Sequence, residues 1–205
     1  MNVERGRWIT EIITLPINLL RDTDYKIMAS RSRARSGTFY LRDSLDTDGA
    51  ATFVTSSTDI SSFVNVLEGE LLRIKQVWWQ WGDDNGGPIK GADLTASKGS
   101  SAVASVSTET RTNVGNINSS NVVSQNTIYA HADATPLIEF ISNETSANPK
   151  DLDDGFLVAT DALHLNVNMG DAFANEVRAY VMMECEIVKL SLSDAQAVLV
   201  SQTVG

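Results

Sequence analysis

The chain contains 205 residues, of which 42% are hydrophobic and 20% are charged, and its 16 basic and 26 acidic residues give a formal net charge of −10. This length predicts a single domain that buries a core of its own. One cysteine and two histidines exclude a disulfide framework and a zinc site built from Cys and His, and the acidic balance argues against a strongly cationic nucleic-acid-binding domain.

The N-terminal segment is positively charged, unlike the rest of the chain. Residues 1–42 hold eight basic and four acidic residues, a net charge of +4, whereas residues 43–205 have a net charge of −14. Within this segment the apolar run 8–20 is interrupted by Glu11 and does not predict a signal peptide. No stretch of the chain is apolar for long enough to predict a membrane span. We therefore expect a soluble protein made in a cytosol.

Three arginines alternate with small residues near the end of this segment. They are Arg31, Arg33 and Arg35, and on a strand they would share one face. Such a face suits the phosphates of a nucleic acid or the acidic surface of a neighbouring copy. It equally suits a solvated edge strand whose charges discourage aggregation. The sequence leaves these three interpretations open.

Short apolar or alternating runs predict a series of β-strands. These runs are residues 8–15, 25–29, 38–41, 51–55, 71–81, 101–107, 121–130, 137–141, 156–167 and 176–190. A bend at Thr160 and Asp161 divides the run 156–167 into two strands. Residues 142–155 are predicted to form an acidic loop.

The run 71–81 (LLRIKQVWWQW) is the strongest strand candidate and contains three tryptophans. Strict alternation places Trp78 on one face, and Trp79 and Trp81 on the other. We expect Trp78 to pack inward, with Trp79 and Trp81 covering a sheet face or a subunit interface. The alternative is an aromatic platform on Trp79 and Trp81 that stacks a sugar.

The C-terminal residues depart from the strand pattern. Ser193 followed three residues later by Gln196 forms a capping-box motif. It predicts a short helix over residues 195–202.

These elements predict an all-β fold. Many short strands separated by turns, without a βαβ alternation, indicate an antiparallel β-sandwich, a jelly roll of about eight strands, with a short C-terminal helix. Residues 1–42 are predicted to be a basic segment with the first strands, either part of the single domain or an arm between subunits. Residues 43–205 form the sandwich body.

The residue types that carry chemistry show no catalytic pattern. His131 and His164 lack a partner at motif spacing, and Cys185 lies on the apolar face of a strand between two glutamates, which favours a buried, unreactive thiol. The acidic turns at 83–86 and 151–155 do not match the spacing of an EF-hand loop. We therefore predict no enzyme activity, no catalytic residue, no metal and no cofactor, although a hydrolase built on the carboxylates of these turns is an alternative.

The whole chain resembles the single jelly-roll capsid proteins of small or tailless icosahedral viruses. The resemblance rests on the strand series from Trp8 to Leu190, the arginine row within Ser30–Ser36, and the closing strands in 156–167 and 176–190. It implies a structural protein of the virion, made in the host cytoplasm. Its partners would be copies of itself, other virion proteins and the genome nucleic acid. The arginine row is shorter and less cationic than the basic arms of that family.

Subunit or nucleic-acid contacts are accordingly expected at Arg31, Arg33, Arg35, Trp79 and Trp81. Two other functions fit the same pattern. A phage tail-tube or baseplate β-sandwich would form rings or tubes, and a carbohydrate-binding module would use Trp79 and Trp81.

Overall fold

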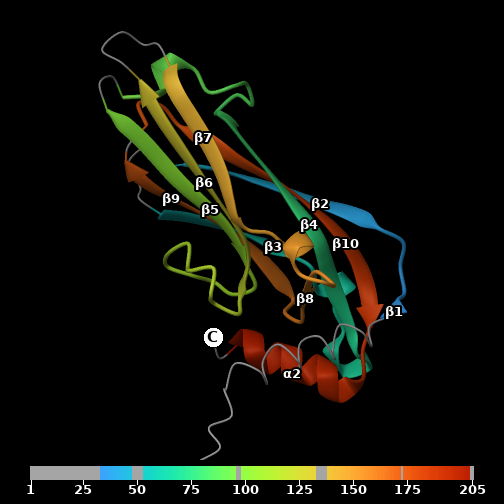
Figure 1. Ribbon diagram of the computed structural model, residues 1–205. Helices are drawn as coiled ribbons and strands as arrows, with labels where there is room; N and C mark the ends of the chain where they lie inside the picture. Colours follow the sequence, from blue (N-terminus) through green and yellow to red (C-terminus); the bar gives the residue numbers. More distant parts are fainter. Residues whose placement is uncertain (1–32, 48–52, 96–97, 133–137, 172, 204–205) are drawn as a thin grey trace, which may run out of the picture.

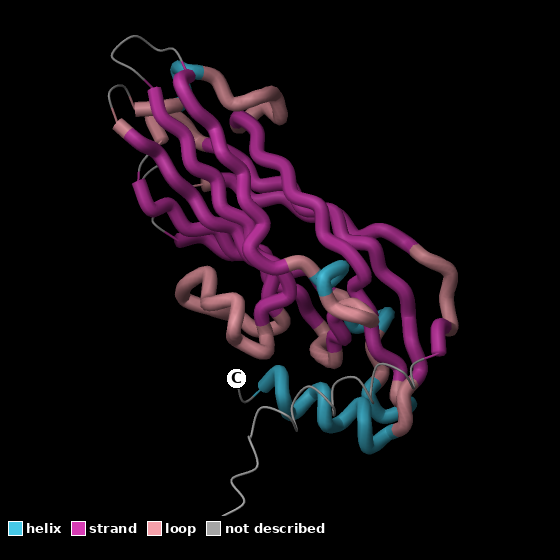
Figure 2. Tube along the Cα trace, viewed as in Figure 1, coloured by secondary structure: helices cyan, strands magenta, loops and turns pink. Residues whose placement is uncertain are grey.

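Two antiparallel β-sheets packed face to face form the body of the protein, and one α-helix crosses an end of the sandwich (Figures 1 and 2). The computed structural model describes residues 33–47, 53–95, 98–132, 138–171 and 173–203. The strands are β1 (Arg33–Ala34), β2 (Phe39–Asp46), β3 (Phe53–Asp59), β4 (Glu70–Asp83), β5 (Gly99–Ser107), β6 (Val122–Ala132), β7 (Ile138–Ala147), β8 (Phe156–Val158), β9 (Ala162–Asp171) and β10 (Val177–Lys189). The helices are η1 (Ser61–Phe63), η2 (Val66–Glu68), η3 (Gly91–Asp93), η4 (Pro149–Asp151) and α2 (Leu192–Thr203).

The strand order is that of a jelly roll. One sheet, the β4 sheet, runs β2-β10-β4-β8, with the short β1 also paired to β10. The other, the β5 sheet, runs β3-β9-β5-β6-β7. Apart from β1 and β7, the first strand pairs with the last (β2 with β10), the second with the second last (β3 with β9), and so on to β5 with β6. This nesting is the rolled hairpin of an eight-stranded jelly roll, as the sequence predicts, with β7 added at one edge.

Most of the predicted strands are confirmed, including the pair β8 and β9 on either side of the predicted bend. The predicted strands 8–15 and 25–29 lie outside the described residues. Residues 33–42 belong to the sandwich, because β1 and β2 pair with β10.

The prediction of a loop from residue 142 is wrong for residues 142–147. This stretch continues β7 along β6, with Glu144 opposite Thr127. β7 is the outermost strand of its sheet, and its polar composition suits an edge that meets solvent.

A β-bulge in β4 reverses the predicted orientation of the tryptophans. The pairing with β10 passes from Ile74 opposite Cys185 to Gln76 opposite Glu184, so Lys75 is an extra residue. A bulge of this kind moves every later side chain to the other face. Val77, Trp79 and Trp81 therefore point into the sandwich with Leu72 and Ile74, and Trp78 points outward.

The core fills the space between the sheets with residues of unequal size. Trp81 packs in one cluster with alanines from β5 and β6, among them Ala102, Ala104 and Ala130, whose small side chains leave room for the indole. Branched and aliphatic residues, such as Leu72, Ile74 and Leu165, fill the other half. The strands with small side chains, β5 and β6, thus pack opposite the large indole of Trp81, and together they fill the core closely.

The crossover from β7 to β8 is fixed by Asn148. Its amide accepts a hydrogen bond from the Val77 backbone N–H at 3.2 Å and donates one to the Val77 carbonyl at 2.7 Å, in place of a neighbouring strand. β8 is only three residues long and pairs with β4 only at residues 72–74. Asn148 thus continues the edge pairing of β4 beyond the end of β8.

We expect Asn148→Ala to lower the free energy of unfolding by about 1–3 kcal/mol, because it leaves two polar groups of the buried Val77 without partners. The matched control is Asn143→Ala, at an exposed position of the neighbouring β7. Urea denaturation followed by circular dichroism measures both. Equal stabilities of the two variants would contradict this role for Asn148.

Helix α2 is longer than predicted and is capped by a different residue. It begins at Leu192, and the Ser191 hydroxyl accepts a hydrogen bond from the Asp194 N–H at 3.3 Å and donates one to the Asp194 carboxylate at 2.7 Å. The predicted cap, Ser193, lies inside the helix. Ala195 and Val198 pack on Leu71, Leu157 and Val188 at the end of the β4 sheet.

Nowhere in the described part of the chain is a helix both long and apolar enough to cross a membrane.

Candidate interaction face

Of the three arginines in the row, only Arg35 has a described side chain. Arg31 and the side chain of Arg33 lie outside the described residues, although the Arg33 backbone pairs with Lys189 in β1. Arg35 follows the strand, donates its backbone N–H to the Ile187 carbonyl at 2.8 Å and forms an ion pair with Glu70. Its charge is therefore balanced within the same subunit.

Trp79 and Trp81 connect the two sheets from the inside. The Trp79 Nε1 donates a hydrogen bond to Ser124 Oγ at 2.9 Å, and the Trp81 Nε1 donates one to Asn126 Oδ1 at 2.7 Å. Ser124 and Asn126, both on β6, in turn donate to the Ala147 carbonyl and to Thr145 Oγ1 of β7. Trp81 is only 8% exposed. The bulge turns both indoles inward, so the sheet face that they cover is the inner face of the β4 sheet, and the prediction that Trp78 packs inward is wrong.

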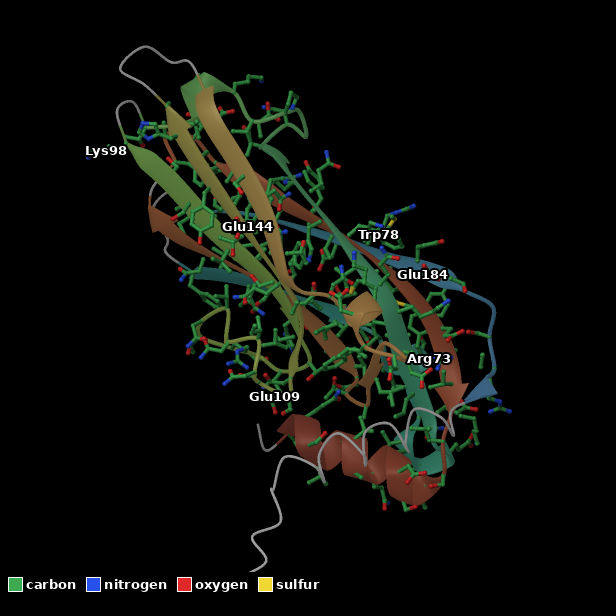
Figure 3. All side chains as sticks on the ribbon, in the orientation of Figure 1. Arg73, Trp78, Lys98, Glu109, Glu144 and Glu184 are labelled. Atoms are coloured by element: carbon green, nitrogen blue, oxygen red, sulfur yellow. The ribbon has the colours of Figure 1, made fainter. Side chains whose placement is uncertain are left out.

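The outer face of the β4 sheet is a regular array of side chains that the sequence pattern did not identify. Strand β10 lies between β2 and β4, and the register defines rows of three across them. From the loop end, the rows are Asp46–Arg178–Gly82, Ser44–Tyr180–Gln80, Arg42–Met182–Trp78 and Tyr40–Glu184–Gln76. In Figure 3, Trp78, Glu184 and Arg73 lie along β4 and β10, whereas Glu144 lies over the other sheet.

The centre of this array is aromatic and partly exposed. We call six of its members, Tyr40, Arg42, Gln76, Trp78, Gln80 and Met182, the aromatic face. The ring centroids of Tyr40 and Trp78 are 6.3 Å apart, and Tyr40 is 52% exposed. Within the described residues, the Arg42 guanidinium and the Gln76 and Gln80 amides have no side-chain hydrogen bond or ion pair. Their polar atoms are free to bind another molecule.

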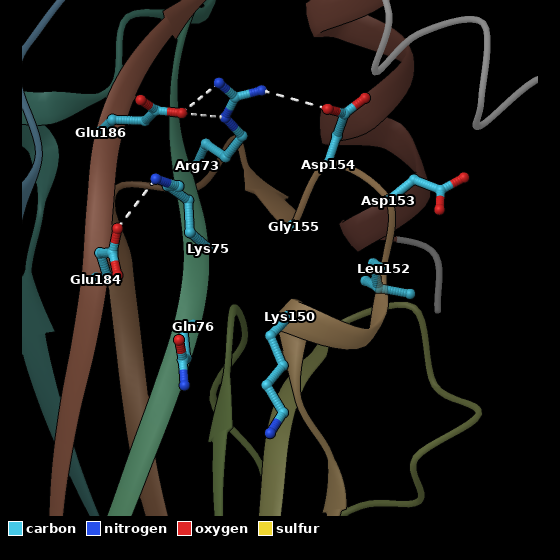
Figure 4. A pocket seen from close by; sticks show the side chains of 10 residues that line it. All are labelled: Arg73, Lys75, Gln76, Lys150, Leu152, Asp153, Asp154, Gly155, Glu184 and Glu186. Atoms are coloured by element: carbon cyan, nitrogen blue, oxygen red, sulfur yellow. Dashed lines mark hydrogen bonds and ion pairs between the residues drawn. The ribbon is translucent and has the colours of Figure 1, made fainter.

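A hollow of about 400 Å³ adjoins the aromatic face toward α2 (Figure 4). Gln76 and Glu184 belong to both the hollow and the array. The other lining residues are Arg73, Lys75, Lys150, Leu152, Asp153, Asp154, Gly155 and Glu186. These residues come from β4, β10 and the segment around η4, so the crossover fixed by Asn148 forms one wall of the hollow.

The charges in and around the hollow are balanced by ion pairs on the same subunit. Lys75 Nζ lies 3.0 Å from Glu184 Oε1, and this partner raises the pKa of Lys75. Arg73 pairs with Glu186 and lies 4.0 Å from Asp154. Most of the charged groups in this region therefore already have a partner of opposite charge on the same subunit.

At the loop end of the array, Arg178 is bound by Asp46. The guanidinium forms two hydrogen bonds with the carboxylate, and the pKa of Arg178 is raised as a result. This ion pair and Gly82 make up the row of the array nearest the loop end.

The acidic turn at Asp83 organises its own loop. Its carboxylate accepts hydrogen bonds from the Gly87 and Asn85 N–H groups and pairs with Lys90 at 2.7 Å, and these contacts lower the pKa of Asp83, with Lys90 the largest cause. Asp93, nearby, accepts from the Lys90 N–H and from Asn175. Among the described residues, no group of three or more Asp, Glu, His or Cys side chains could hold a metal ion.

Cys185 is fully buried in the sandwich core, as the alternation predicts. Burial raises the pKa of its thiol to about 12. Burial also lowers the pKa of His164, which is partly exposed on the outer face of the β5 sheet.

We expect Cys185 in the folded protein to react with a thiol reagent at pH 8 at less than about one hundredth of the rate in the unfolded chain, because the reactive thiolate is suppressed and shielded. Labelling with 5,5′-dithiobis(2-nitrobenzoate), with and without denaturant, measures the ratio. Rapid labelling of the native protein would contradict a buried position for this residue.

No protein-family model matches this chain, and no curated protein matches its sequence.

Proposed function

We propose that this chain is a virus capsid protein whose copies assemble into an icosahedral shell. The observation that carries the proposal is the strand order of the sandwich, the nested eight-strand pairing of a jelly roll. Viral capsid domains commonly use this fold, and lectin domains and cupins use it too. Because a fold alone does not determine a function, the choice depends on the surfaces.

Two features of the chain favour assembly. The first is the basic residues of 1–42, a stretch with a net charge of +4 against −14 for the remainder. Residues 33–42 belong to the sandwich, and there Arg42 is exposed on β2 without an ion pair to any described residue of the same subunit, so it can attract an acidic group of another copy. The second counts against the carbohydrate-binding alternative: Trp79 and Trp81, the two indoles that a sugar platform would need, point into the sandwich and bond to Ser124 and Asn126. The proposed partners are copies of the chain, with other virion proteins or genome nucleic acid as further contacts, and the proposed location is the virion.

Sedimentation velocity of the purified protein over a range of concentrations and salt tests the proposal. We expect species of many subunits in equilibrium with small oligomers. A protein that stays strictly monomeric at high concentration and low salt would overturn the proposal. Open rings or tubes would replace it with the tail-tube alternative.

A further inference from the structure

We infer that the aromatic face is a contact surface between two copies of this chain, an inference that rests on the proposed function because it names the surface used in assembly. The occupant is a second copy bound face to face about a two-fold axis, so that the same side chains are buried on both sides.

The composition of the face is that of an interface centre. Tyrosine, tryptophan, methionine and arginine are enriched at interface centres, and tryptophan, tyrosine and arginine are the commonest energetic hot spots. Trp78, Met182 and Arg42 occupy one row across three strands, and Tyr40 lies beside Trp78. The lysine and glutamate side chains next to them, Lys75 and Glu184, are bound to each other.

The charge balance of this surface lets two acidic chains approach each other. Copies with a net charge of −10 repel one another at long range. The array and the hollow together hold five cations and five carboxylates, so this region is electroneutral. The cations are Arg42, Arg73, Lys75, Lys150 and Arg178, and the carboxylates are Asp46, Asp153, Asp154, Glu184 and Glu186. A face-to-face contact through this region therefore brings no net charge of one copy against the other.

The face is also held rigid before binding. Trp78 and Met182 stand on neighbouring strands, β4 and β10, and β10 is paired on both sides. The inward-facing indoles of Trp79 and Trp81 anchor the other face of the same stretch of β4. The backbone beneath the face therefore loses little conformational freedom on binding, which favours affinity. Arg42 supplies a free cation that can stack on an aromatic ring of the second copy or pair with one of its carboxylates.

Light scattering after size exclusion tests the inference with three variants. Trp78→Ser and Tyr40→Ser remove aromatic members of the face. The matched control is Tyr129→Ser, because Tyr129 is a strand tyrosine on the outer face of the β5 sheet and is 47% exposed, close to the 52% of Tyr40. Thermal denaturation by circular dichroism verifies that all three fold. We expect each face variant to raise the concentration of half-association at least about 30-fold, because the substitution removes a hot spot from both copies and the loss of one alone has this effect, and we expect the control to leave it unchanged.

The outcomes separate this inference from the proposed function. Wild-type dimers that depend on Trp78 and Tyr40 but never close into shells would support the contact and overturn the shell. Shells formed equally well by the face variants would support the shell and overturn the contact. Wild-type protein without any association overturns both. Quenching of Trp78 fluorescence by oligothymidine or by a neutral oligosaccharide, with no dimer, would assign the face to that ligand and also overturn the contact.

Discussion

Replacing Trp81 by alanine is expected to lower the free energy of unfolding by about 3–5 kcal/mol, whereas Trp78→Ala is expected to cost about 1 kcal/mol. Trp81 is 8% exposed, packs against alanines of the opposite sheet and hydrogen-bonds to Asn126, so its removal opens a cavity and leaves a buried amide with an unpaired oxygen. Trp78 lies on the outer face against Tyr40, where water takes its place.

Guanidinium denaturation followed by far-ultraviolet circular dichroism measures both variants under the same conditions. The pair is a direct test of the β-bulge at Lys75, because without it strict alternation places Trp78 in the core and Trp81 outside. A larger loss for Trp78→Ala than for Trp81→Ala would show that β4 keeps the uninterrupted alternation. Trp81→Phe is a useful third variant, since it retains most of the packing and isolates the loss of the indole N–H.

Replacing Gly155 by alanine is expected to cost about 2–3 kcal/mol or more. Gly155 has a φ of +75°, which residues with a side chain rarely adopt, and an added Cβ would lie 2.5 Å from the Ile74 carbonyl oxygen. The neighbouring atom is backbone within the β4 sheet, so it does not move aside. The loop that closes the hollow would therefore shift or the sheet would distort.

The control for this variant is Gly37→Ala. An added Cβ at Gly37 meets nothing within 4 Å, and we expect a change of about 0.5 kcal/mol or less. The same denaturation experiment measures both glycines. Similar stabilities for the two variants would contradict the close approach of the 152–155 turn to β4.

The strands could largely be predicted because each repeats a local pattern. β10 alternates in sequence from Val177 to Val188, and its burial follows this alternation as far as Cys185. Beyond Cys185 the burial changes phase, because Val188 packs in the cluster beneath α2. The order of strands in the sheets follows from pairings between residues far apart, such as β2 with β10, and no local pattern encodes these. The jelly roll could be expected only as a class of fold that suits many short antiparallel strands.

The predictions that proved wrong lie where a bulge shifts the alternation by one residue, where a strand lies at the edge of its sheet, or where two capping motifs compete. In β4 the signal was present: Lys75 and Gln76 are two consecutive polar residues, and Val77, Trp79 and Trp81 resume the alternation with opposite phase. At the start of α2 the capping hydrogen bonds join Ser191 and Asp194, and not Ser193 and Gln196 as the motif predicted. In β7 the polar run 142–147 resembles a loop because an edge strand exposes much of its surface.

The candidate site was the part that sequence reasoning could least identify. Arg42, Met182 and Trp78 come from three strands separated by long stretches of chain and meet only through the register of the β4 sheet. A tryptophan cluster correctly indicated the right strand, but the face each indole occupies depends on the bulge. The neutrality of this surface also depends on pairs such as Arg178 with Asp46, which are distant in sequence.

Electron microscopy of the purified full-length protein is the most direct test of the central claim that this jelly roll is the building block of a shell. We expect closed, uniform particles whose averages show icosahedral symmetry, and we expect Tyr129→Ser to form them as readily as the wild type. A field of isolated small particles at every concentration and salt condition would contradict it.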